Sequence, residues 1–352
     1  MSQQFYSLRV SQVERQTPKA VAITLEIPET LKEKYIYRNG QYITIKKTIA
    51  GEELRRSYSI CSAWQAKEAF QIAVKEVEGG KMSPFLNRQL NPGDFIEVST
   101  PEGNFIWDSG QLHEEANVFL YAGGSGITPI FGILKQLLLT STKLVHLAYA
   151  NKNPDEIIFR DELKWWQKKF PDQLYITNFI EENGERFEKA LPGRISSTWF
   201  NEQDLGDLKS SHHYICGPGP MMEFVKSQLQ LLGVPHNLIH MEFFEAPDEE
   251  LEDTSAPFSG NAQVTVLLDG VESNLEINES ETILSAMLKA GLDAPYSCQG
   301  GVCATCRALV DDGEVYLSQN LGITDGEIQE GFTLTCSSYP RSSKIKINFD
   351  AA

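Results

Sequence analysis

The strongest constraint on this chain is the spacing of four cysteines near its C-terminal end. Four residues separate Cys298 from Cys303, two separate Cys303 from Cys306, and Cys336 follows at a distance. A C-x4-C-x2-C spacing with a distant fourth cysteine is typical of plant-type [2Fe–2S] clusters, in which thiolates supply two ligands to each iron. Zinc sites more often show paired short spacings, and a glycine-containing gap fits them poorly. The pattern therefore predicts that these four cysteines hold a [2Fe–2S] cluster.

The length and the cysteine content bound the rest of the chain. Its 352 residues predict two or three domains rather than a single core. The N-terminal residues have neither a basic segment nor an apolar core, so we expect no signal peptide. The two cysteines outside the cluster motif, Cys61 and Cys216, lie in unrelated segments, so no disulfide framework is expected. This cysteine usage favours a reducing compartment and hence a cytoplasmic location.

The charge of the chain excludes one class of partner and leaves another open. A net charge of −17 argues against nucleic acid, which needs a basic surface. Residues 262–352 alone hold thirteen Asp and Glu against five Lys and Arg. This acidity serves either solubility or docking to an electron acceptor of complementary charge. The apolar stretch 118–139 contains glycines, a proline and Lys135, so we expect no membrane span. The oligomeric state is left open.

Residues 1–110 are expected to form a small antiparallel β-barrel, because short β-rich runs alternate with turn signals. Within this domain, the run from Arg56 to Ser59 has chemistry suited to a flavin. Arg56 can pair with a phosphate, and the ring of Tyr58, two residues further along a strand, can address the same ligand. The hydroxyl of Ser59 can reach the reactive nitrogen edge. The alternative is a core tyrosine beside a surface arginine.

Residues 111–246 are expected to form an α/β domain with a parallel sheet. A buried strand, a glycine-rich loop and a helix follow one another, and this order predicts a phosphate-binding turn at Gly124 and Gly126. Further alternation of strands and helices places the ligand at the carboxyl edge of the sheet. Lys152, just after the second strand, is the candidate for a coenzyme 2′-phosphate, and it favours NADPH over NADH.

Residues 247–261 are acidic and rich in turn formers, so we expect a linker before the cluster domain of residues 262–352. Two roles are open for this linker. It is either a passive spacer or a tether that lets the cluster domain move between the flavin and the electron acceptor.

Together these motifs resemble the ferredoxin–NADP⁺ reductase superfamily, extended by a plant-type ferredoxin domain. The resemblance implies a multidomain protein with an antiparallel β-barrel flavin domain, an α/β nicotinamide domain and an α+β, β-grasp ferredoxin domain. It implies FAD rather than FMN, held by Arg56, Tyr58, Ser59, Lys75, Gly80 and Ser83. It implies that the nicotinamide coenzyme, NADPH or NADH, contacts Gly124, Gly126, Thr128, Lys152, Cys216, Gly217, Pro218, Met221 and Phe244.

The same resemblance implies catalytic roles beside the flavin and the nicotinamide for Ser59, Cys216 and Glu242. For Cys216 the alternative is a small buried residue that only fills space at a strand end. Glu242 and Phe244 belong to an E-x-F segment that ends the reductase module in this superfamily.

The order of the three domains predicts an electron relay. Nicotinamide delivers two electrons as hydride, a cluster carries one at a time, and a flavin between them can accept both and release them singly. We therefore expect an NAD(P)H-dependent FAD/[2Fe–2S] reductase that serves a partner protein. Another class, a redox sensor without turnover, is opposed by the intact flavin and nicotinamide motifs.

Almost the whole sequence resembles the reductase components of ring-1,2-phenylacetyl-CoA epoxygenase complexes, which act in phenylacetate degradation. The matching stretches include residues 51–61, 124–129 and 300–306. This resemblance implies a di-iron oxygenase as the partner. The alternative is a reductase of the same build that serves another acceptor, such as a different hydroxylase, a desaturase or a hybrid-cluster protein.

Overall fold

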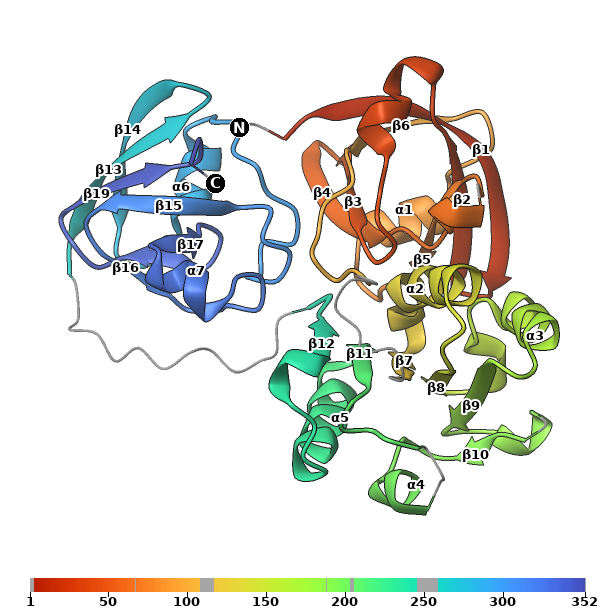
Figure 1. Ribbon diagram of the computed structural model, residues 1–352. Helices are drawn as coiled ribbons and strands as arrows, with labels where there is room; N and C mark the ends of the chain where they lie inside the picture. The colour runs from red at the N-terminus through yellow and green to blue at the C-terminus, as the bar shows by residue number, and fades with distance from the viewer. Residues whose placement is uncertain are drawn as a thin grey trace. The chain divides into compact units, whose positions relative to one another are not determined.

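The computed structural model describes residues 3–66, 68–107, 117–187, 189–202, 206–245 and 259–351. Residues 247–258, most of the expected acidic linker, lie outside this set. The chain divides into two compact units, whose elements are labelled in Figure 1. The larger unit comprises Tyr6–Leu54 and Tyr58–Glu242, and the smaller comprises Phe243–Ala352 with Met1–Phe5 and Arg55–Ser57.

The N-terminal part contains a six-stranded sheet in the order β4-β3-β6-β1-β2-β5. Its strands are β1 (Phe5–Thr17), β2 (Ala20–Glu26), β3 (Tyr42–Ile49), β4 (Glu52–Ser59), β5 (Phe70–Lys75) and β6 (Phe95–Ser99). An antiparallel bridge joins Ile60, just after the edge strand β4, to Ile72 within the other edge strand, β5. Alternate residues such as Leu8 and Val10 fill the interior, as a pleated strand requires. The antiparallel barrel predicted from the sequence is confirmed.

The second part of the larger unit is a parallel sheet in the order β10-β9-β8-β7-β11-β12. Its strands are β7 (Val118–Gly123), β8 (Val145–Asn151), β9 (Leu174–Ile180), β10 (Leu191–Pro192), β11 (His212–Cys216) and β12 (Ile239–Glu242). Four helices accompany them: α2 (Ile127–Thr140), α3 (Arg160–Lys169), α4 (Ser197–Glu202) and α5 (Gly219–Leu231). Strands β7 and β11 are buried along their whole length, as expected for central strands covered on both faces.

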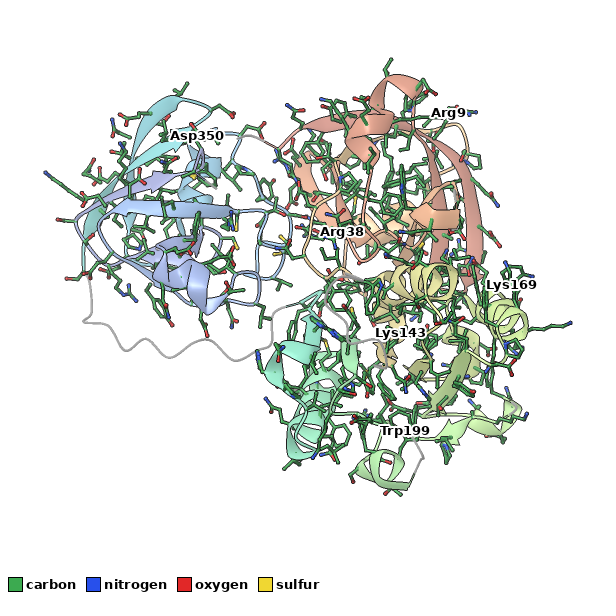
Figure 2. All side chains as sticks on the ribbon, in the orientation of Figure 1. Arg9, Arg38, Lys143, Lys169, Trp199 and Asp350 are labelled. Carbon is green, nitrogen blue, oxygen red and sulfur yellow. The ribbon has the colours of Figure 1, made fainter. Side chains whose placement is uncertain are left out.

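Both faces of the parallel sheet are packed. Residues of α2 and α3, including Leu134 and Trp166, join one apolar core with alternate residues of β7 and β8. On the other face, Trp199 of α4, which is labelled in Figure 2, lies edge-on to the ring of Tyr121. The apolar stretch 118–139 is therefore a strand, a turn and a helix, as predicted. No helix in the described ranges is long and apolar enough to cross a membrane.

The smaller unit contains a mixed five-stranded sheet in the order β14-β13-β19-β15-β17. Its strands are β13 (Asn261–Leu268), β14 (Val271–Asn278), β15 (Arg307–Asp312), β17 (Phe332–Leu334) and β19 (Lys344–Asn348). The pair β16 (Val315–Leu317) and β18 (Ser338–Pro340) and the helices α6 (Ile283–Lys289) and α7 (Asp325–Gln329) complete the unit. The hydroxyl of Thr282 caps α6, whose residues Ile283 and Met287 pack into the core. This α+β arrangement agrees with the predicted β-grasp domain.

Candidate functional site

The glycine turn after β7 lies directly against the loop after β11. A Cβ atom on Gly126 would stand 2.1 Å from the carbonyl oxygen of Cys216, and one on Gly123 would stand 2.5 Å from Cδ of Pro218. Only residues without a side chain permit so close an approach. The chain crosses from β7 to β8 on one side and places β11 on the other, so this is the topological switch point where α/β sheets bind ligands. The structure thus joins two motifs that the sequence suggested separately.

Cys216 and Glu242 stand beside this turn, at the ends of neighbouring parallel strands and in register. Cys216 is fully buried, and its burial, followed by the charge of Glu242, raises the pKa of its thiol well above the usual value. Burial also raises the pKa of Glu242 to about 8. Both groups are therefore mainly neutral at pH 7. The Oε2 atom of Glu242 is shielded from solvent and has no hydrogen-bond partner among the described residues, so it is available to a ligand.

The other residues predicted at the nicotinamide site lie in different elements and are buried to different degrees. Thr128 is buried in the first turn of α2, two residues after the glycine turn. Met221 lies in α5, and its side chain contacts the position that a Cβ on Gly217 would occupy. Phe244 follows β12 and keeps 41% of its surface exposed. Contact of Phe244 with the nicotinamide coenzyme or with the flavin stays a prediction.

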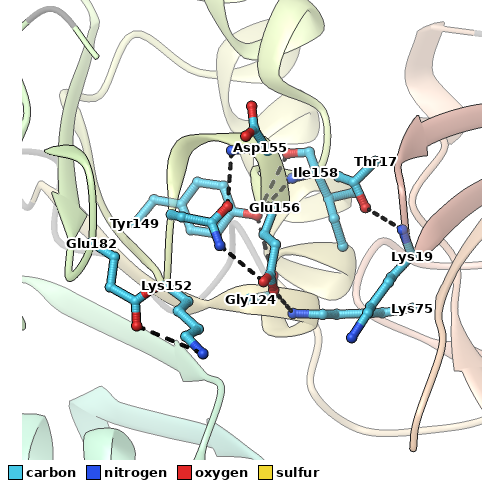
Figure 3. A network of polar contacts seen from close by, with 11 residues as sticks. Thr17, Lys19, Lys75, Gly124, Tyr149, Lys152, Asp155, Glu156, Ile158 and Glu182 are labelled. Atoms are coloured by element: carbon cyan, nitrogen blue, oxygen red, sulfur yellow. Dashed lines mark hydrogen bonds and ion pairs between the residues drawn. The ribbon is translucent and has the colours of Figure 1, made fainter. Parts of the chain in front are cut away.

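Lys75, predicted at the flavin, ends β5 and reaches toward the glycine turn. Its Nζ donates to Oε2 of Glu156 at 2.9 Å, in the short helix η5 (Pro154–Glu156) that follows β8 (Figure 3). The same Nζ is 3.6 Å from the position of a Cβ on Gly124. The hydrogen bond from Lys75 lowers the pKa of Glu156, so this carboxylate is ionised. Sequence reasoning missed Glu156, and its only signal is the acidic helix start directly after a strand at the ligand edge.

Strand β4 carries the candidate flavin residues. Arg56 is exposed, and its Nη1 donates to the carbonyl of Arg55 at 2.7 Å, which leaves further guanidinium donors for a phosphate. Tyr58 is half-buried and packs against the barrel core, and Ser59 is buried at the strand end. An exposed guanidinium and a partly exposed ring two residues apart fit an FAD molecule lying along this strand.

The Gly80 segment that was expected to hold the pyrophosphate forms a tight turn before α1 (Met82–Arg88). The hydroxyl of Ser83 accepts a hydrogen bond from the backbone N–H of Val77 at 3.0 Å. A Cβ on Gly80 would stand 3.3 Å from that hydroxyl. Ser83 therefore shapes this turn, and its contact with FAD remains a prediction.

In the cysteine loop, backbone N–H groups point at cysteine sulfur atoms. The backbone N–H groups of Gly300, Val302 and Cys303 each donate to Sγ of Cys298 at 3.4 Å. Hydrogen bonds from Cys303 and Cys336 and from the N–H groups of Gly300 and Val302 lower the pKa of Cys298, whereas hydrogen bonds among the cysteines and burial raise the pKa of Cys303 and Cys336. The N–H of Gly301 donates to Sγ of Cys336 at 3.3 Å, which brings the distant fourth cysteine to the loop.

The backbone conformation and close packing of Gly301 explain why this loop needs a glycine there. Its φ is +72°, and a Cβ there would stand 2.6 Å from the carbonyl oxygen of Gln319. Among the residues that the structure covers, no three His, Cys, Asp or Glu side chains are arranged around a single metal ion. A [2Fe–2S] cluster does not require that arrangement, because each of its irons takes only two protein thiolates. The donor set and its N–H groups fit such a cluster.

Comparison with known proteins identifies the three parts of the chain. Three protein-family models match it: an oxidoreductase FAD-binding domain over residues 7–107, an oxidoreductase NAD-binding domain over residues 120–227, and a 2Fe-2S iron-sulfur cluster binding domain over residues 266–341. FAD, a nicotinamide coenzyme and a [2Fe–2S] cluster are therefore the redox groups of this protein. The exact boundaries of residues 1–110, 111–246, 247–261 and 262–352 remain predictions.

Relatives that match along nearly their whole length share this organisation. The chain is 35% identical over 354 residues to a component of the 1,2-phenylacetyl-CoA epoxidase of Escherichia coli K12, covering 99% of this chain and 98% of that protein. It is 31% identical to the ferredoxin reductase component of 3-ketosteroid-9-alpha-monooxygenase of Rhodococcus rhodochrous, covering 97% and 96%. The structure of phthalate dioxygenase reductase shares the fold, with a TM-score of 0.62 at 24% identity over 98% of both chains. The chain therefore belongs to the ferredoxin–NADP⁺ reductase superfamily, among the flavin and iron–sulfur reductases that serve oxygenases.

Proposed function

We propose that this chain oxidises NADH or NADPH at the switch point of its parallel sheet and supplies the electrons to a di-iron phenylacetyl-CoA epoxygenase. The main observation in support of the coenzyme site is the close approach of Gly126 to the carbonyl of Cys216. It brings the phosphate-binding turn next to the residues expected beside the nicotinamide. The choice of oxygenase is supported by the 35% identity to the Escherichia coli epoxidase component, which extends over 99% of this chain.

The residues of the larger unit prepare hydride transfer in three ways. The glycine turn lets backbone N–H groups approach the coenzyme pyrophosphate. Cys216 and Glu242, both mainly neutral at pH 7, place an uncharged thiol and an uncharged carboxyl at neighbouring strand ends beside this turn. Buried Thr128 and Cys216 exclude water from the region beside the turn. When bound, FAD takes the hydride electrons as a pair, and the cluster takes them one at a time.

On β4, we assign Arg56 to a phosphate of FAD and Tyr58 to the face of its ring system. Ser59 is assigned to the edge of the flavin at which the hydride arrives. These roles are supported by the exposed guanidinium of Arg56 and by the half-buried ring of Tyr58. Cys298, Cys303, Cys306 and Cys336 are assigned as the cluster ligands.

The surface charge supports the proposed partner, and the cysteines support the proposed compartment. The excess of acidic residues in 262–352 suits an oxygenase with a basic docking surface. None of the six cysteines, all of which the structure describes, is joined in a disulfide, which is the state expected in the cytoplasm.

The test is reconstitution with defined oxygenase components. The holoprotein, mixed anaerobically with NADH or NADPH, should lose its flavin absorbance and then its cluster absorbance. It should then support epoxidation of phenylacetyl-CoA by the oxygenase component of a phenylacetyl-CoA epoxidase. The ketosteroid 9α-monooxygenase oxygenase is the matched control, because its reductase is also a relative, at 31% identity. Faster turnover with the ketosteroid enzyme would overturn the choice of partner, and an unreduced flavin would overturn the whole proposal.

A further inference from the structure

The corner where β8 and β9 end contains a carboxylate that the sequence did not associate with the coenzyme. Lys152 follows β8 directly, and its Nζ lies 3.7 Å from Oε1 of Glu182, which follows β9 (Figure 3). The backbone N–H of Glu182 donates to the carbonyl of Lys152 at 2.7 Å. The two residues are thus joined through their backbones as well as through their charges. The residue predicted to bind a 2′-phosphate is therefore paired with an acid.

Glu181, the residue before Glu182, pairs with a different basic residue in the same corner. Glu181 receives two hydrogen bonds from the guanidinium of Arg194, at 2.9 and 3.3 Å. The four side chains Lys152, Arg194, Glu181 and Glu182 together carry no net charge. A phosphate monoester would bring about two negative charges into this corner. A ribose hydroxyl would bring none, and it can donate a hydrogen bond to a carboxylate, as in NAD-binding folds.

We propose that Glu182 is a specificity-determining residue for the coenzyme, because by pairing with Lys152 it disfavours the 2′-phosphate of NADPH and so favours NADH. This inference rests on the proposed function and refines it. It also reverses the preference for NADPH that Lys152 alone suggests. Glu182 acts here through Lys152, as a positioning residue rather than as a catalytic one.

The effect is modest, because the side chains of Lys152 and Glu182 remain 62% and 57% exposed. Interactions between charges at such exposure change an equilibrium by at most about fivefold. Glu182→Gln should therefore raise the ratio of kcat/KM for NADPH to that for NADH by about two- to fivefold. Glu26→Gln is the matched control, since it removes the same charge from a pair with Arg9 of similar exposure in the barrel and should leave the ratio within about 1.5-fold. In a Lys152→Ala background, Glu182→Gln should no longer change the ratio.

Two measurements test the inference on the holoprotein. Stopped-flow bleaching of the flavin gives the coenzyme ratio, and calorimetry compares binding of adenosine 2′,5′-bisphosphate with that of adenosine 5′-monophosphate. Glu182→Gln should strengthen binding of the bisphosphate relative to the monophosphate by the same factor. An unchanged ratio in both measurements, an equal change in Glu26→Gln, or a full change in the Lys152→Ala background would each overturn the inference. If the flavin is not reduced but the binding ratio shifts, the proposed function fails and the inference stands.

Discussion

Replacing Gly126 by alanine tests the contact that builds the coenzyme site. Its backbone, with φ of −59° and ψ of −11°, suits any residue, so alanine introduces no backbone strain. The added methyl group would stand 2.1 Å from the carbonyl oxygen of Cys216, whereas real Cβ atoms essentially never approach closer than 3.0 Å. The two loops must therefore separate by about 0.9 Å, the difference between these two distances.

This separation sets the expected magnitudes. Overpacking of this kind destabilises a protein by about 1 to 3 kcal/mol, so Gly126→Ala should unfold at a lower temperature but still fold. A displacement of about 1 Å near reacting groups can cost about a hundredfold in rate. We therefore expect kcat/KM for flavin reduction by NADH and NADPH to fall about a hundredfold, while the FAD and cluster contents remain unchanged.

The matched control is Gly219→Ala, at the first residue of α5. A Cβ there would meet nothing within 4 Å, and alanine favours a helix over glycine. This variant should keep the wild-type rate and unfold at the same or a slightly higher temperature. Anaerobic stopped-flow at the flavin absorbance and thermal unfolding measure both quantities. Flavin reduction by Gly126→Ala within about threefold of wild type would refute the assignment of this contact to the coenzyme site.

Three further changes test the other parts of the site. Cys303→Ser should abolish the cluster spectrum while NAD(P)H still bleaches the flavin; a retained cluster spectrum would contradict the ligand assignment. Tyr58→Ala should lower FAD retention after gel filtration, and an unchanged flavin content would remove Tyr58 from the site. Glu242→Gln tests the pKa of about 8, which is raised from the usual 4.5. Since the neutral carboxyl is the form favoured by folding, wild type should lose stability from pH 4.5 up to about 8, whereas the glutamine variant should not. Parallel curves of unfolding temperature against pH would show that Glu242 titrates normally.

The parts of the site that could be predicted from the sequence are those built from short, continuous segments. The cysteine spacing and the glycine turn are local, because each needs a few neighbouring residues in one conformation. The sequence also predicted that the ligand lies at the carboxyl edge of the parallel sheet, but the close approach of the Cys216 loop to the glycine turn came only from the structure, which places β7 beside β11. Nor did the sequence predict that Glu182 pairs with Lys152, since that contact depends on the lengths of the loops after β8 and β9. A lysine at a strand end predicts a phosphate ligand, but an acidic side chain that the fold brings next to it, as with Glu182 and Lys152, changes that prediction.

Two ion pairs that could not be predicted from the sequence connect the barrel to the parallel sheet. Lys75 of the barrel pairs with Glu156, and Lys135 of α2 pairs with Glu68 of the barrel part at 2.6 Å. Lys135 is only 1% exposed, so removing its partner would leave a buried charge, which typically costs about 3 to 5 kcal/mol. Hydride transfer requires the reacting atoms to be held about 3 to 3.5 Å apart. The flavin residues lie in the barrel and the nicotinamide residues in the sheet, so this distance can be kept only if the two parts hold a fixed relative position. Both ion pairs join these two parts and so help to fix that position.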